Sequence, residues 1–140
     1  MPELNAVQGL LQGLLIEERQ LSSAYTAYLP LLHPPVLREK IRGWVGEGWK
    51  HIEALEKEIE KRGAVAGRSA APAPTDPASD ETHDLLDFFF QKEERLYYSY
   101  QEALKRTEAE DLRSLLFRHL EEQKGHIAGI QNLYAEFLYY

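Results

Sequence analysis

Two glutamates in the chain are each followed four residues later by a histidine, in matching surroundings. The first pair is Glu47 and His51 in "EGWKHIEAL", and the second is Glu122 and His126 in "EEQKGHIAGI". Residues at i and i+4 share one face of a helix, so each pair presents a carboxylate and an imidazole to the same neighbour. The sequence has no cysteine, so a metal site in it has to use His, Asp or Glu, and thiolate sites and disulfides are excluded.

Two further glutamates stand at equal distances before these pairs. Glu18 precedes Glu47 by 29 residues, and Glu93 precedes Glu122 by the same interval. The turn between Glu18 and Glu47 centres near His33, so antiparallel pairing of two helices brings both carboxylates to one height. The same geometry applies to the second pair. The spacing therefore predicts that six potential ligands converge at one level: Glu18, Glu47, His51, Glu93, Glu122 and His126.

A shift of 75 residues, without a gap, superimposes the two halves of the chain. Leucines recur by chance in many helical hairpins, but here polar positions match at the same offset, which favours an internal repeat. The matched pairs are Glu18 and Glu93, Leu21 and Leu96, Tyr25 and Tyr100, Leu29 and Leu104, Leu37 and Leu112, Arg38 and Arg113, Glu47 and Glu122, His51 and His126, and Ile52 and Ile127.

Apolar residues at helical spacing predict four helices, arranged as two hairpins over 2–62 and 80–140. Pro30 stops the first helix, Pro35 begins the second, and Gly63 ends it. The stretch "TEAE", Thr107 to Glu110, is typical of a capping box at the start of the fourth helix.

The segment 63–79 is rich in Ala, Pro, Gly and Ser, and it has no periodic apolar face. It is predicted to be a mobile, protease-sensitive linker. Its 17 residues can extend about 56 Å, whereas helices of roughly 27 residues are about 40 Å long, so the linker can run the length of a bundle. The sequence therefore predicts one all-α domain over 1–140, a ferritin-like four-helix bundle with a long crossover.

Carboxylates in a bundle core are costly to bury unless they are paired. Four glutamates and two histidines around two divalent ions satisfy that need. Tyr25 and Tyr100 either support such a site from behind the ligands or pack at the edge of the bundle with their hydroxyl groups in water. A metal-free bundle, in which the same glutamates would be buried and mutually repulsive, is the alternative.

The quoted segments, together with "EERQLSSAY" and "EERLYYSY" before them, resemble the rubrerythrin branch of the ferritin-like superfamily over nearly the whole chain outside the linker. This resemblance implies a di-iron carboxylate centre that acts on dioxygen, peroxide or ferrous iron, in a protein that is often dimeric. By position, Glu18 and Glu93 would be the single-glutamate ligands, Glu47 and Glu122 the bridging ligands, and His51 and His126 the terminal ones.

The chain departs from that family in the spacing of its ligands. Ferritin-like sites use Glu-x-x-His, whereas both copies here have Glu-x-x-x-His, with Gly48 and Gln123 at the usual glutamate positions. A π-bulge, eased by Gly46, Gly48 and Gly125, is one way to absorb the extra residue. Glycine at these positions would also let a backbone or a metal centre approach closely. The absence of cysteine also excludes a rubredoxin-like domain in this chain, so the electron donor is unknown.

The net charge of -7 and the pI near 5.2 argue against nucleic acid or an anionic membrane as a partner. Small oxidants, cations and protein surfaces remain. The N-terminal stretch has no signal-peptide pattern, which predicts a cytoplasmic protein. Aromatic clusters at 87–90 and 137–140 exceed the needs of one helix stripe, so they are predicted to be partly core and partly the face of a homodimer. The sequence is consistent with two functions. One is a di-iron oxidoreductase, with manganese as an alternative metal, and the other is a metal-free helical module with an assembly or binding role.

Overall fold

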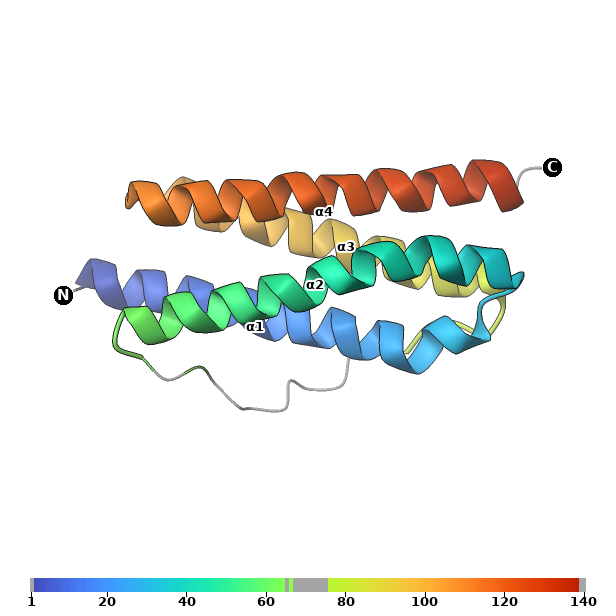
Figure 1. Ribbon diagram of the computed structural model, residues 1–140, viewed down its shortest axis with the longest axis horizontal. Coiled ribbons are helices and arrows are strands. Elements are labelled where there is room, and N and C mark those ends of the chain that lie inside the picture. Colours follow the sequence, from blue (N-terminus) through green and yellow to red (C-terminus); the bar gives the residue numbers. More distant parts are fainter. Residues whose placement is uncertain (1, 65, 67–75, 139–140) are drawn as a thin grey trace.

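The computed structural model describes residues 2–64, 66 and 76–138, and it confirms an all-α four-helix bundle (Figure 1). The four long helices are α1 (Pro2–Tyr28), α2 (Pro35–Lys61), α3 (Thr82–Arg106) and α4 (Glu110–Phe137). A short 3-10 helix, η1 (Leu29–Leu31), follows α1. Pro35 lies in the first turn of α2, and Gly63 follows its end with a φ of 84°, a left-handed conformation that suits glycine.

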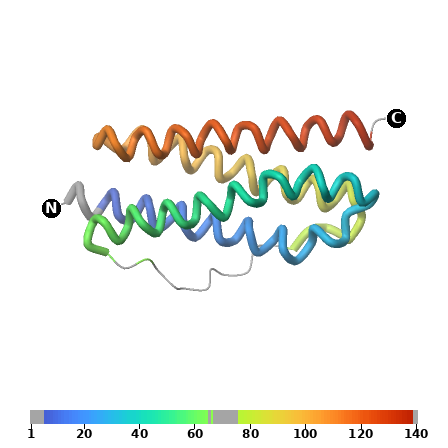
Figure 2. The backbone as a smooth tube through the Cα atoms, in the orientation of Figure 1, coloured from blue at the N-terminus to red at the C-terminus, as the bar shows by residue number. Residues whose placement is uncertain are grey.

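The bundle consists of two antiparallel hairpins packed against each other. Helix α1 packs on α2 and α3, and α4 packs on α3 and α2. Figures 1 and 2 show that α2 ends at the opposite end of the bundle from the start of α3, so the connection between the hairpins is the predicted crossover. Most of the predicted linker, at 65 and 67–75, lies outside the described residues, and its mobility stays a prediction.

The two hairpin turns are held in the same way, which supports the internal repeat. Arg38 Nη1 donates to the carbonyl oxygens of Pro30 (3.0 Å) and Leu32 (3.4 Å) in the first turn. The equivalent Arg113 Nη1 donates to the carbonyls of Leu104 (2.6 Å) and Thr107 (2.8 Å) in the second. These carbonyls have no partner inside a helix that is ending. The matched arginines therefore stabilise matched turns.

The predicted capping box at the start of α4 is wrong. The residue before α4 is Ala109, with no side-chain cap, and Thr107 lies two residues further back. Thr107 Oγ1 instead donates to the carbonyl oxygen of Ala103, 2.7 Å away at the end of α3. A threonine in a short turn can serve either helix end, and here the turn held by Arg113 directs it to α3.

The aromatic cluster at 87–90 belongs to the core of this chain. Phe88 and Phe89 are buried, Phe90 packs against the core, and the Phe89 ring stacks on Tyr25 with centroids 4.4 Å apart. At the C-terminus, Phe137 and Leu138 also pack against the core, and residues 139–140 lie outside the described part. The homodimer stays a prediction, and the buried cluster at 87–90 gives no support to it.

Candidate metal centre

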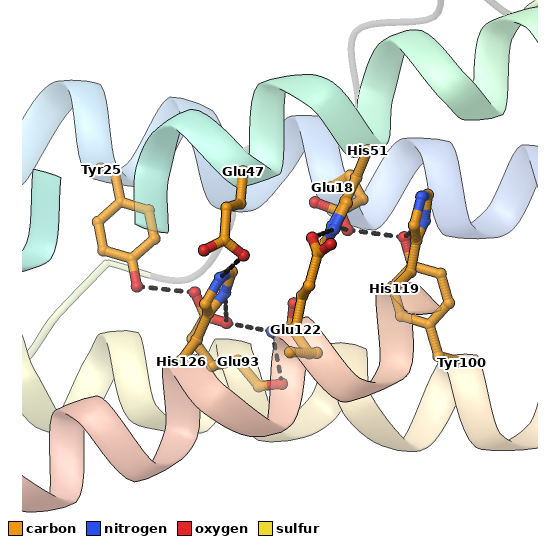
Figure 3. Close-up of polar contacts among 10 residues, drawn as sticks. Glu18, Tyr25, Glu47, His51, Glu93, Tyr100, His119, Glu122 and His126 are labelled. Carbon is orange, nitrogen blue, oxygen red and sulfur yellow. Dashed lines mark hydrogen bonds and ion pairs between the residues drawn. The ribbon is translucent and has the colours of Figure 1, made fainter. Parts of the chain in front are cut away.

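The structure brings all six predicted ligands together in the middle of the bundle (Figure 3). They form two equivalent groups, which we name half-sites. The first half-site is Glu18, His51 and Glu122, and the second half-site is Glu93, His126 and Glu47. Each half-site takes two residues from one hairpin and a glutamate from the other.

In both half-sites an imidazole lies between two carboxylates. His51 Nδ1 is 2.9 Å from Glu18 Oε1, and its Nε2 is 2.6 Å from Glu122 Oε2. His126 Nδ1 is 3.2 Å from Glu93 Oε2, and its Nε2 is 3.2 Å from Glu47 Oε2. Such short contacts from both ring nitrogens are those of an imidazolium ion that donates two hydrogen bonds.

The four glutamate ligands differ in burial according to their helix. Glu18 and Glu93, from α1 and α3, are each only 1 % exposed. The side chains of Glu47 and Glu122, from α2 and α4, are 40 % and 37 % exposed. The site therefore has an interior pair of carboxylates and a second pair that borders solvent, through which a cation can exchange.

Two tyrosines hold the interior carboxylates. Tyr100 donates to Glu18 Oε1 (2.7 Å), and Tyr25 donates to Glu93 Oε1 (2.8 Å), so each hydroxyl reaches across to the other hairpin. Burial, together with the nearby glutamate charges, raises the pKa of both tyrosines well above the usual value. Both hydroxyls therefore remain protonated, and they orient the predicted ligands from behind.

The glutamates also set the charge of the two imidazoles. Burial by itself lowers the pKa of His51, but the hydrogen bonds and charges of Glu18 and Glu122 outweigh it, and the pKa is raised. Glu93 and Glu47 raise the pKa of His126 in the same way against its burial. Burial raises the pKa of Glu18. In the metal-free protein, protons on the two imidazoles supply the positive charge that the carboxylates require.

The altered ligand spacing is not absorbed by a π-bulge. Helices α2 and α4 are α-helical throughout the ligand segments, so this expectation is wrong. Instead, Gln123 at the usual glutamate position is 1 % exposed, and its Nε2 donates to the carbonyl oxygen (3.1 Å) and the Oε2 of Glu93. No backbone from another helix approaches Gly46 or Gly125, because an added Cβ there meets no such atom within 4 Å, and the approach of a metal centre stays a prediction.

The residues present fit a pair of divalent ions in chemistry, and the imidazoles have to move to admit them. Each half-site offers two carboxylates and one imidazole, a donor set suited to iron, manganese or zinc. With the ring between the carboxylates, however, the donors are not gathered around one point. Among the described residues, the group of three donors that all lie within 4.8 Å of one another is instead His83, Asp84 and Asp87, at the partly exposed start of α3.

An aromatic ring stacks on the imidazole of each half-site, and the two rings stand at equivalent positions of the repeat. His119 stacks on His51 with centroids 3.9 Å apart, and its Nδ1 lies 3.1 Å from the Tyr100 hydroxyl. Trp44 stacks on His126 at 5.9 Å, and its Nε1 donates to the Tyr25 hydroxyl (3.1 Å). The shift of 75 residues pairs positions 44 and 119, but their unlike residue types conceal a shared role.

The imidazole of His119 is neutral at pH 7. Burial, the positive charge of His51 and that of Arg118 lower its pKa to about 3. A second residue near the site is Glu17, whose Oε1 accepts from Ser99 (3.0 Å). Its Oε2 is buried and has no hydrogen-bond partner in the described part of the chain. Glu17 is therefore partly buried beside the site and is not a plain surface charge.

The comparisons with known proteins identify the fold. No protein-family model matches the sequence, and no curated protein matches it. A crystal structure of a ferritin-like di-iron carboxylate protein from Bacillus anthracis strain Ames superimposes with a TM-score of 0.82 at 14 % identity, covering 95 % of this chain and 98 % of that one. A Dps1 mutant from Mycobacterium smegmatis superimposes with a TM-score of 0.82 at 15 % identity, covering 94 % and 96 %.

None of the described helices combines the length and the apolar character that crossing a membrane requires.

The two superpositions extend over almost the whole chain and include all four helices. The chain therefore has the fold of ferritin-like di-iron carboxylate proteins.

Proposed function

We propose that this protein binds two iron ions in the centre of its bundle and acts as an oxidoreductase on dioxygen, peroxide or ferrous iron. The observation that carries the proposal is the duplication of the half-site. Each copy has a buried glutamate, a buried histidine and a partly exposed glutamate from the other hairpin. The superimposed protein from Bacillus anthracis is described as a di-iron carboxylate protein, which supports the proposed binding of two iron ions.

Each residue has a distinct role in this proposal. Glu18 with His51, and Glu93 with His126, would each hold one ion. Glu47 and Glu122 each reach from one hairpin into the half-site centred on the other hairpin, so they would be the ligands shared by the two ions. Two divalent ions neutralise four carboxylates, so the protons on the two imidazoles leave when the ions bind. Bound iron would supply the electrons for reduction of a small oxidant.

The finer assignments rest on the sequence resemblance. The paired "EER" segments favour the rubrerythrin branch, and the lack of cysteine requires a separate electron donor. We propose iron as the resident metal, with manganese as the alternative for this set of oxygen and nitrogen donors. A homodimer in the cytoplasm is the proposed state of the protein.

One observation favours a second candidate, a metal-free helical module with an assembly or binding role. The imidazolium ions satisfy both interior glutamates without a metal, since His51 contacts Glu18 and His126 contacts Glu93. In such a bundle the two imidazolium ions balance the two buried carboxylates, and the two partly exposed carboxylates are left to water. Its function would then reside on its surface.

Anaerobic titration of the purified metal-free protein with ferrous iron separates the two candidates. We expect two ions per chain, with release of protons on binding. Glu47→Ala and Glu122→Ala should each lose most of the bound iron, because each removes a ligand shared by both ions. The matched controls Glu53→Ala and Glu121→Ala alter exposed glutamates of the same helices and should keep it. Absence of binding, or equal loss in the controls, would contradict the proposal.

A further inference from the structure

A small cavity lies beside the second half-site, and residues of all four helices line it, including Gln123 and His126 of α4. Its volume is about 10 Å³, which is room for about one water-sized molecule. Leu21, Trp44 and Val45 give it an apolar wall, and the carboxylates of Glu18 and Glu93 face it from the interior. The cavity therefore touches the buried glutamate of each half-site.

The absence of a side chain at Gly48 keeps this space open. A Cβ at Gly48 would lie 3.6 Å from Ser22 Oγ and 3.8 Å from Glu18 Oε2, which are ordinary contact distances. Alanine therefore fits there without strain, whereas the additional carbons of a larger side chain would have to occupy the cavity. Gly46, two residues earlier, has open space around it and is not involved.

The repeat has larger residues at the positions equivalent to Gly48 and Ser22. The position equivalent to Gly48 is Gln123, whose buried side chain donates to Glu93. The position equivalent to Ser22 is Tyr97, a far larger residue. On the α3 and α4 side, side chains thus take the space that glycine and serine leave free on the α1 and α2 side.

We propose that Gly48 and Ser22 form the entrance through which a neutral molecule of one or two heavy atoms, such as dioxygen, reaches the interior carboxylates. The size of the cavity excludes larger organic substrates, and its apolar side chains together with the carboxylates of Glu18 and Glu93 favour an uncharged molecule over an anion. As a path to bound metal, the entrance rests on the proposed function. The occupancy of the cavity by dioxygen does not, since it depends on shape and polarity alone.

The test uses the metal-free protein and the paramagnetism of dioxygen. Methyl groups of leucine are labelled with carbon-13, and their relaxation is measured under nitrogen and under pressurised dioxygen. Leu21 lines the cavity, and its repeat equivalent Leu96, also buried, is the internal control. We expect the enhancement at Leu21 to exceed that at Leu96 at least threefold.

Two glycine variants complete the test. Gly48→Val should reduce the enhancement at Leu21 to the level of Leu96, and Gly48→Ala should reduce it partly. Gly46→Val adds the same side chain where nothing is near, and it should leave the enhancement unchanged. Equal enhancement at the two leucines of the wild type, or an excess that persists in Gly48→Val, would overturn the proposal.

A second arm examines the loaded protein. With iron bound to the same content in both variants, oxidation by dissolved dioxygen should be at least tenfold slower in Gly48→Val than in Gly46→Val. Equal rates would show that dioxygen reaches the metal by another path and would overturn the entrance. If the protein takes up no iron, the proposed function fails, and the relaxation experiment still decides whether dioxygen enters the cavity.

Discussion

The two half-sites have the same ligands and different surroundings. Both place an imidazole between two carboxylates and direct a tyrosine at the buried one. Beside the first half-site stands His119, and beside the second stands Trp44. The repeat has thus kept the groups that a pair of cations needs, while the rings behind them have become different.

The difference changes what the supporting hydrogen bonds can do. The indole of Trp44 can only donate, so the Tyr25 hydroxyl accepts from it and donates to Glu93. Tyr100 gives its one proton to Glu18, so the Nδ1 of His119 donates to the Tyr100 hydroxyl, and the His119 ring can still take up a second proton. The first half-site therefore has a titratable group within hydrogen-bond distance of its tyrosine, and the second has a fixed donor.

The largest expected effect comes from removal of the imidazoles, and it tests whether the half-sites are equivalent. His51→Ala and His126→Ala each leave a buried glutamate without its ion-pair partner. In the metal-free protein each should lower the free energy of unfolding by about 3–5 kcal/mol. Chemical denaturation of both variants at neutral pH provides the measurement. A loss under about 1 kcal/mol in either would contradict the buried ion pair.

A smaller effect, in pH dependence, should separate the two half-sites. The pKa of His119 is about 3 in the folded protein, against about 6.5 in an unfolded chain. The unfolded state therefore binds the additional proton as the pH falls below 6.5, and His119 lowers stability in acid. Between pH 7 and pH 5 this should cost the metal-free wild type about 2 kcal/mol of unfolding free energy that His119→Phe does not lose.

The matched control for this prediction is Trp44→Phe, which removes the equivalent ring without removing a titratable group. Its stability should follow the wild type between pH 7 and pH 5, shifted by a constant amount. Chemical denaturation of the wild type, His119→Phe and Trp44→Phe at pH 7 and pH 5 provides the measurement. Parallel behaviour of His119→Phe and the wild type would contradict a depressed pKa at His119.

The smallest effects concern two glycines on α4 near the second half-site. A Cβ at Gly129 would lie 2.6 Å from the Trp44 ring, whereas one at Gly125 meets nothing within 4 Å. Gly125→Ala should raise the unfolding free energy by up to about 1 kcal/mol through helix propensity. Gly129→Ala displaces a rigid ring, so overpacking of about 1–3 kcal/mol should outweigh that gain. Changes of the same sign in thermal melts would contradict the close packing of Trp44.

The sequence predicts the bundle and the meeting of the ligands because both depend on periodicity. Helical spacing determines which residues face inward, and the equal intervals before His51 and His126 place the six ligands at one height. The paired tyrosines follow from the same repeat. The side chains that meet there were therefore predictable, although their role as metal ligands stays a prediction.

Features that depend on a neighbour from another helix were not predictable. Gly129 is needed because Trp44 of α2 lies against it, and nothing in the local sequence shows that contact. Thr107 fits a capping pattern, yet it turns to the carbonyl of Ala103 because of the geometry of the turn. Likewise, the number of aromatic residues at 87–90 indicates both a core and an interface, and only the packing shows that Phe88 and Phe89 belong to the core of the same chain.

The central claim is that the two half-sites hold two metal ions between them. Crystals grown with ferrous iron, measured at wavelengths on both sides of the iron absorption edge, locate the ions directly by anomalous scattering. Two peaks are predicted, one among Glu18, His51 and Glu122, and one among Glu93, His126 and Glu47. The absence of any peak in the bundle, or a lone peak beside His83, Asp84 and Asp87, would contradict the account.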